Sequence, residues 1–257
     1  MEFSVAMHTD IGIQKDTNQD SLCIKQASTE KGNILLALIC DGMGGLEKGE
    51  LASATTIKEF SRWFEEELPC HLAKANYVED IQYRWERMIK EQNQLISDYG
   101  RTHRIQLGTT ITTLLIFEDG EYIIGHVGDT RAYMISNETV EILTQDQTVV
   151  AREVRQGKLT QEEAANDPRR NVLLQCIGAS KIVEPDFVKG KVQEGQCYML
   201  CSDGFRHVIT TEEIKQAFEP KNNQNEEQMK NNIVSLIETN KERGETDNIS
   251  AILIKIM

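Results

Sequence analysis

Short apolar runs with an aspartate at one end recur along this chain and constrain its fold more than any other feature. Residues 34–40 form an uninterrupted apolar run, and Asp41 and Gly42 follow it directly. A run of this length that ends in glycines is typical of a buried strand, which here delivers a carboxylate to the edge of its sheet. Taken alone, the Asp-Gly pair predicts only a turn.

The same pattern returns at four other places. Two strand-like runs end just before an aspartate, and two apolar runs begin just after one. In neighbouring antiparallel strands, an acid after one strand and an acid before the next lie at the same edge of the sheet. We therefore expect the carboxylates to converge, although unrelated turns would leave the same signs in the sequence. The acids are Asp20, Asp41, Asp129, Asp203 and Asp247.

Carboxylates gathered at one place repel one another, and a bound cation is a usual means of keeping them ionised. No run of Lys or Arg flanks these acids, and the repeated motifs offer oxygen donors without His or Cys. Oxygen donors favour hard cations such as Mg²⁺ or Mn²⁺ over zinc. The pattern predicts a divalent metal site at the edge of a sheet.

The composition of the chain limits the kinds of molecule that the protein can bind. The 257 residues with 39% hydrophobic content suffice for one domain with a full core. The formal net charge of −13 argues against nucleic acid or an anionic membrane as a partner, because both would be repelled. An anionic substrate would need a local cation to reverse the field.

The cysteines and the start of the chain favour a cytoplasmic protein. Five of the six cysteines stand in apolar surroundings, as small core residues do in a reducing compartment, and only Cys70 has polar neighbours. The first residues lack a basic start and a long apolar stretch, and no segment approaches the roughly 20 apolar residues of a membrane helix.

Helical periodicity separates the groups of strands. Residues 46–68 and 78–99 are predicted to form two long amphipathic helices, the second with Leu95 on its buried side. A second pair is predicted at 211–218 and 226–240.

The segment from residue 146 to residue 194 differs from the rest of the chain. Short charged helices are predicted at 149–156 and 160–165, and the basic pair Arg169 and Arg170 follows them. We interpret this segment as an excursion from the sheet, although most such charge runs are solvated surface helices.

Taken in order, the motifs resemble the metal-dependent Ser/Thr protein phosphatases of type 2C, in their prokaryotic branch. Each motif is weak alone, but the series is specific and covers nearly the whole chain. It consists of Gly12 to Lys15, Asn18-Gln19-Asp20, Asp41-Gly42-Met43-Gly44-Gly45, Gly108-Thr109-Thr110, Val127-Gly128-Asp129-Thr130-Arg131, Ser202-Asp203-Gly204 and Asp247-Asn248.

The resemblance implies an α+β fold, a four-layer α-β-β-α sandwich with two central antiparallel sheets. Residues 1–257 would form a single catalytic domain, and the excursion at about 146–194 would be its flap subdomain.

The resemblance also implies a centre of two Mg²⁺ or Mn²⁺ ions. Asp41 would bridge both ions, the Gly42 carbonyl would bind the first, and Asp203 and Asp247 would hold the second. Two such ions lower the pKa of a water, so that a hydroxide bridging them attacks phosphorus in line near neutral pH. Asp41, Asp203 and Asp247 are the expected catalytic residues.

Three other positions receive roles from the same resemblance. Asp129, together with Asp203, would offer a weaker site for a third ion. Asp20 would lie in the supporting shell and hold metal-bound waters. Lys15 stands where relatives carry a phosphate-binding Arg, and it is the expected substrate contact.

The proton donor for the leaving group has no assignment. Many relatives have a His where Met43 stands, and a thioether has no proton to donate. His207, close to Asp203 in the sequence, is the one histidine we single out, although histidines in such positions are more often structural.

The implied function is cytoplasmic signalling by dephosphorylation of phosphoserine and phosphothreonine in proteins, opposing a Ser/Thr kinase, and we expect a monomer. The alternative is a phosphatase-like regulatory or binding protein with little activity. The acids at 41, 129, 203 and 247 favour the enzyme, because degenerate members usually lose some of them. A small phosphorylated molecule as substrate also stays open.

Overall fold

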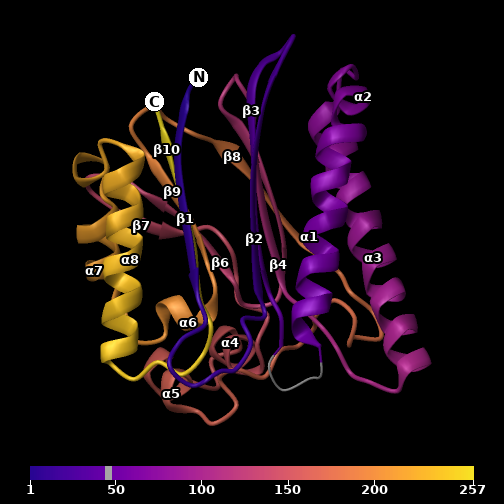
Figure 1. Ribbon diagram of the computed structural model, residues 1–257, viewed down its shortest axis with the longest axis vertical. Helices are drawn as coiled ribbons and strands as arrows, with labels where there is room; N and C mark the ends of the chain where they lie inside the picture. Colours follow the sequence, from indigo (N-terminus) through magenta and orange to yellow (C-terminus); the bar gives the residue numbers. More distant parts are fainter. Residues whose placement is uncertain (44–47) are drawn as a thin grey trace.

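Two antiparallel five-stranded sheets pack face to face in the computed structural model, which describes residues 1–43 and 48–257, and helices cover both outer faces (Figure 1). Gly44 and Gly45 of the glycine motif and the predicted helix start at residue 46 lie outside the described residues.

The first sheet has the strand order β1-β10-β9-β6-β7, and every neighbouring pair is antiparallel. Its strands are β1 (Phe3–Asp10), β10 (Ile249–Ile256), β9 (Cys197–Cys201), β6 (Arg131–Ile135) and β7 (Val140–Ile142). The short helix α6 (Asp203–Arg206) follows β9, and α7 (Thr211–Phe218) and α8 (Glu226–Glu242) cover the outer face, with the 3₁₀ turn η1 (Pro220–Asn222) between them.

The second sheet has the order β2-β3-β4-β5-β8, again antiparallel throughout. It consists of β2 (Asp20–Thr29), β3 (Gly32–Asp41), β4 (Ile111–Ile116), β5 (Glu121–Val127) and β8 (Asp186–Lys191). The helices α1 (Gly49–Glu66), α2 (Leu68–Leu72) and α3 (Tyr77–His103) lie on its outer side (Figure 1).

Strand β3 is apolar without interruption because both of its faces are buried. Leu36, Leu38 and Cys40 face the helices, whereas Leu35 and Ala37 face the other sheet. The alternation follows from the two-residue period of a strand. The pairing of β3 with β2 places Asp41 at the end of the strand, opposite Asp20.

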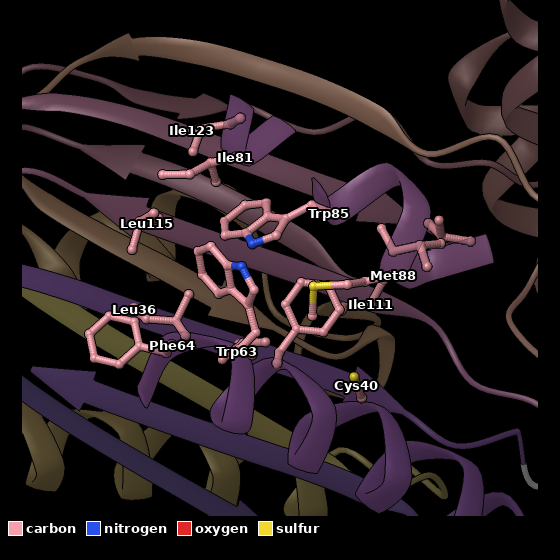
Figure 2. Close-up of a cluster of buried hydrophobic side chains, with 14 of the residues drawn as sticks. Leu36, Cys40, Trp63, Phe64, Ile81, Trp85, Met88, Ile111, Leu115 and Ile123 are labelled. Atoms are coloured by element: carbon pink, nitrogen blue, oxygen red, sulfur yellow. The ribbon is translucent and has the colours of Figure 1, made fainter. Parts of the chain in front are cut away.

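The core between the second sheet and its helices is rich in aromatic side chains (Figure 2). Trp63 of α1 and Trp85 of α3 meet edge to face, with ring centroids 5.4 Å apart, in the same cluster as Leu36 and Leu115 of the sheet. Such offset aromatic pairs add about 0.5–1.5 kcal/mol to the burial of apolar area. This packing holds the two long helices on the sheet that carries Asp41.

The predicted helices are present, with ends that differ by a few residues. One prediction is wrong: Leu95 is 55% exposed, whereas Ile96 is buried beside it. The packed face of α3 passes through Gln92, Asn93 and Ile96 near its C-terminal end, and the Asn93 side chain there contacts the segment after residue 175.

The segment 146–194 contains two short helices, α4 (Val149–Arg155) and α5 (Gln161–Asn166), at the end of the sandwich that also carries α6 (Figure 1). Its last part rejoins the second sheet, because β8 pairs with β5 along its whole length. The excursion from the sheet therefore ends before residue 186.

All six cysteines are free, and only Cys70 is exposed. No helix within residues 1–43 and 48–257 has the length and apolar character needed to cross a membrane.

Candidate active site

Asp20 and Asp41 lie side by side at the end of the second sheet. Strands β2 and β3 form a hairpin in which these two residues are directly paired. The backbone of Asp41 is held from the next strand, because its carbonyl accepts hydrogen bonds from Thr110 N at 2.9 Å and Thr109 Oγ1 at 2.9 Å. The position of the Asp41 carboxylate is thus set by the sheet rather than by a free loop.

Gly42 allows the chain to pass very close to other backbone. A Cβ atom there would lie 2.4 Å from Gly49 O and 2.6 Å from Gln19 O, distances that no side chain tolerates. The Gly42 amide also donates to Gln19 O at 3.1 Å. Only glycine fits, and its main chain lies directly beside Asp41 at the site.

Asp203 and Asp247 come from the first sheet. Asp203 begins α6 just after β9, and Asp247 precedes β10, which is the neighbour of β9. Ser202 and Ser250 bind each other's backbone and join the two segments, with Ser202 N to Ser250 O at 3.1 Å and Ser250 N to Ser202 Oγ at 3.0 Å.

Asp129 lies where the chain crosses from one sheet to the other. It follows Gly128 in the link between β5 and β6. Gly128 has φ +111, and a Cβ there would meet Thr110 Cγ2 at 2.5 Å, so this crossing requires glycine.

The structure thus brings together the acids that the strand pattern predicted. Burial raises the pKa of Asp41 well above its usual range, and the charges of the other acids act in the same direction. Burial likewise raises the pKa of Asp20 to about 7 and that of Asp129 to about 7. The neighbouring acids raise the pKa of Asp41 because like charges disfavour its ionised form. The acids acting on Asp41 are Asp20, Asp203, Asp129 and Asp247.

The chemistry of this cluster fits divalent cations. Within residues 1–43 and 48–257, no three Asp, Glu, His or Cys side chains already surround one point closely enough to hold an ion. Both carboxylate oxygens of Asp20 are nevertheless buried without a hydrogen-bond partner. Buried orphan oxygens beside other buried carboxylates are costly unless a cation or ordered water satisfies them. The donors are oxygens, as Mg²⁺ and Mn²⁺ prefer.

Comparison with known proteins agrees with this arrangement. The family model described as Protein phosphatase 2C matches residues 12–252. This chain belongs to the protein phosphatase 2C family. The family and the enzyme class expected from the motifs, a Ser/Thr protein phosphatase, are thereby confirmed.

Relatives at similar length support the assignment. A "Putative protein phosphatase 2C-type" of Streptococcus pyogenes serotype M6 is 32% identical over 260 residues, which cover 97% of this chain and 96% of the relative. The solved structure of the S. agalactiae serine/threonine phosphatase superposes with a TM-score of 0.83 at 28% identity and full coverage of both chains. The predicted α+β sandwich with two antiparallel sheets is confirmed.

A further solved structure bears on the metal. The catalytic domain of the serine threonine protein phosphatase PstP in complex with 2 manganese ions has a TM-score of 0.78 and 25% identity, with 98% of this chain and 97% of that chain covered. A two-ion site is therefore known in a protein of the same fold.

Lys15 reaches this phosphatase 2C site, although it contacts an acid. Its Nζ lies 2.9 Å from Asp247 Oδ1. Burial alone would lower the pKa of Lys15, but the hydrogen bond to Asp247 and the charges of Asp41 and Asp203 raise it above its usual value. The predicted role of Lys15 in phosphate binding stays a prediction, and its place beside the acids is a finding.

Asn248 has a part that the sequence did not reveal. Its Nδ2 donates to Ile11 O at 2.9 Å and to Thr17 O at 3.2 Å, while its Oδ1 accepts from Gln19 N at 2.9 Å. These bonds tie the segment that carries Lys15 to the start of β10. The Asp247-Asn248 pair was a visible motif, but nothing in it indicated what the amide would hold.

His207 bridges two acidic residues. Its Nε2 lies 3.4 Å from Asp203 Oδ2 and its Nδ1 lies 3.2 Å from Glu245 Oε2. Glu245 Oε1 in turn accepts from the backbone amides of Thr246 at 2.7 Å and Asp247 at 2.9 Å. The sequence indicated His207 through its spacing from Asp203, whereas Glu245 gave no such sign.

A cavity of about 870 Å³ adjoins Asp129 and is bordered by the segment 144–171. Its lining carries four arginines beside three carboxylates, those of Asp129, Asp146 and Glu245, in a chain that is acidic as a whole. The basic side chains are Arg131, Arg155, Arg170 and Arg206. Arg131 and Arg206 already pair with Asp146 and Asp129, which leaves Arg155 and Arg170 to face an anionic substrate.

Proposed function

We propose that this chain hydrolyses phosphoserine and phosphothreonine in proteins with the help of two bound Mg²⁺ or Mn²⁺ ions. Asp41, the carbonyl of Gly42, Asp203 and Asp247 would hold the ions. One observation carries the proposal: buried carboxylates from both sheets converge at one end of the sandwich, on backbone that other strands fix in place.

The reaction divides between the ions and the residues of the chain. When bound, two divalent ions supply a nucleophilic hydroxide at neutral pH and stabilise charge on the phosphoryl oxygens. Asp41 and Asp203 come from different sheets, so together they would fix the spacing of the ions. Asp20, paired with Asp41 and buried, would hold water through its two free oxygens.

Substrate binding involves positive side chains. Lys15 Nζ lies among the acids and can turn from Asp247 to a phosphoryl oxygen when Asp247 binds a metal. The cavity between the sandwich and the segment 144–171 would receive residues of the substrate that flank the phosphate. We propose the segment 146–185, with α4 and α5, as the moving part of the flap.

The proposed substrate is a protein rather than a small molecule, because a small phosphate ester would not reach this cavity wall. The alternative of a phosphatase-like binding protein is not favoured, since the predicted acids are intact and meet at one place. A cytoplasmic location, an opposing Ser/Thr kinase and a monomeric state stay predictions.

Two isosteric substitutions test the proposal. Asp41→Asn and Asp203→Asn should each lower Mn²⁺-dependent phosphate release from a phosphothreonine peptide by several orders of magnitude, because each removes a charged metal ligand. Asp98→Asn, on α3 at a side chain that is 49% exposed, is the matched control and should keep wild-type activity. Wild-type turnover in either folded site variant would refute the assignment of these acids.

A further inference from the structure

Arg206 lies across the place where a third ion was expected. It is at the end of α6, one turn after Asp203, and its side chain points back to the β5–β6 crossing. Its Nη2 donates to the backbone carbonyl of Asp129 at 2.9 Å and lies 4.0 Å from Asp129 Oδ2. The side chain is only 12% exposed, so this cation is part of the interior.

A second ion pair fixes the guanidinium in this position. Arg206 Nη2 also lies 3.2 Å from Asp146 Oδ2. Arg131 also binds Asp146: its Nε donates to Asp146 Oδ1 at 2.7 Å and its Nη2 donates to Asp146 Oδ2 at 2.7 Å. Such a bidentate contact with a carboxylate requires the planar guanidinium of arginine. Asp129, Asp146, Arg131 and Arg206 therefore form one unit, a network of ion pairs between segments that are distant in the sequence.

The formal charges of this unit sum to zero when both carboxylates are ionised. It holds two carboxylates, Asp129 and Asp146, and two guanidinium groups, Arg131 and Arg206. Arginine stays protonated in proteins, so both positive charges are permanent. A divalent ion on Asp129 would add positive charge beside Arg206, and no further acid within the unit would compensate for it.

Asp203, the other ligand expected for a third ion, is also partly engaged. His207 Nε2 lies 3.4 Å from its Oδ2, and the same ring is held by Glu245 on its far side. The imidazole therefore lies beside one carboxylate oxygen of Asp203. Asp203 is thus left with its other oxygen for the two-ion centre.

We propose that the guanidinium of Arg206 takes the place of the third metal ion beside Asp129, so that this chain binds two ions and Asp129 serves as the partner of Arg206. The inference rests on the proposed two-metal function. It replaces the expectation that Asp129 binds a third ion. Arg206 would instead hold Asp129 in place and, through Asp146, the start of the flap segment.

Counting bound Mn²⁺ tests this directly and needs no activity measurement. Equilibrium dialysis at saturating Mn²⁺, followed by metal analysis, should give about two ions per chain for the wild type. Asp129→Asn should bind the same number. Arg206→Lys, which keeps the positive charge, should also bind the same number.

Removing the charge should open the site. Arg206→Gln leaves Asp129 without its cation, and we expect an additional, weaker Mn²⁺ equivalent that disappears again in Arg206→Gln/Asp129→Asn. Circular dichroism establishes that each variant is folded. If Arg206→Gln does not fold, the comparison of wild type with Asp129→Asn decides alone.

The contrary results are distinct. Loss of one bound ion in Asp129→Asn, or a folded Arg206→Gln that gains none, would overturn the role of Arg206. A wild-type protein that binds no Mn²⁺ would instead refute the proposed two-metal function on which the inference rests.

Discussion

The structure gives Lys15 a role that the sequence alone does not indicate. In the sequence, Lys15 is a loop residue that only the resemblance connects with phosphate. In the structure its Nζ contacts Asp247 Oδ1 at 2.9 Å, and Asn248 fastens the backbone on both sides of it. Lys15 therefore neutralises part of the acid cluster, and a metal on Asp247 would free it for substrate.

Replacing Lys15 separates these two tasks. Lys15→Ala should raise KM for a phosphopeptide roughly 10- to 150-fold, since a charged hydrogen bond contributes roughly 1.5–3 kcal/mol. Affinity for Mn²⁺ should stay level or rise, because Asp247 loses a competing partner. Lys15→Arg should keep KM level or lower it.

Steady-state kinetics and Mn²⁺ titration measure both effects. Unchanged kinetics of Lys15→Ala on every phosphorylated substrate would show that Lys15 is only a surface lysine.

At the scale of elements, the flap segment separates two arginines that the sequence presents as a pair. Arg169 is bound within the segment, with Nη2 2.9 Å from Glu153 Oε2 and 2.7 Å from Asp167 Oδ2. Arg170 instead lines the cavity beside Asp129. The two neighbours therefore have different surroundings: one holds the loop after α5 to α4, and the other faces the space for substrate.

Charge reversal at Arg170 should act on large substrates. Arg170→Glu should lower kcat/KM for a phosphopeptide severalfold more than for a small aryl phosphate, because only the peptide extends into the cavity. Arg152→Glu, an equal charge change at an exposed position of α4 outside the cavity lining, is the control. Equal losses on both substrates, or equal effects of the two variants, would contradict a role of this cavity in peptide binding.

At the scale of the whole molecule, much of the fold could be predicted because strands buried on both faces appear in the sequence as continuous apolar runs. The runs that became β3, β9 and β10 are apolar at nearly every position, since both sides of each strand face a core. Acids at their ends then mark one end of the sandwich, and this local pattern was enough to predict that the five acids come together there.

What the sequence did not show depends on contacts between distant segments. Asp146 and Arg206 are 60 positions apart, and no periodicity links them. The exposure of Leu95 depends on which side of α3 meets the segment after residue 175, and helical spacing cannot choose between neighbouring faces. Pairings of this kind follow from the completed fold, so they are found in the structure.

The central claim is that the acids at one end of the sandwich act through bound metal ions to hydrolyse phosphoproteins. The most direct measurement is phosphate release from a phosphothreonine peptide by the purified wild-type protein, first after chelation and then after Mn²⁺ or Mg²⁺ is added back. The account predicts no release without metal and full recovery on addition, because the nucleophile depends on the ions. Release that persists after complete removal of metal would contradict it.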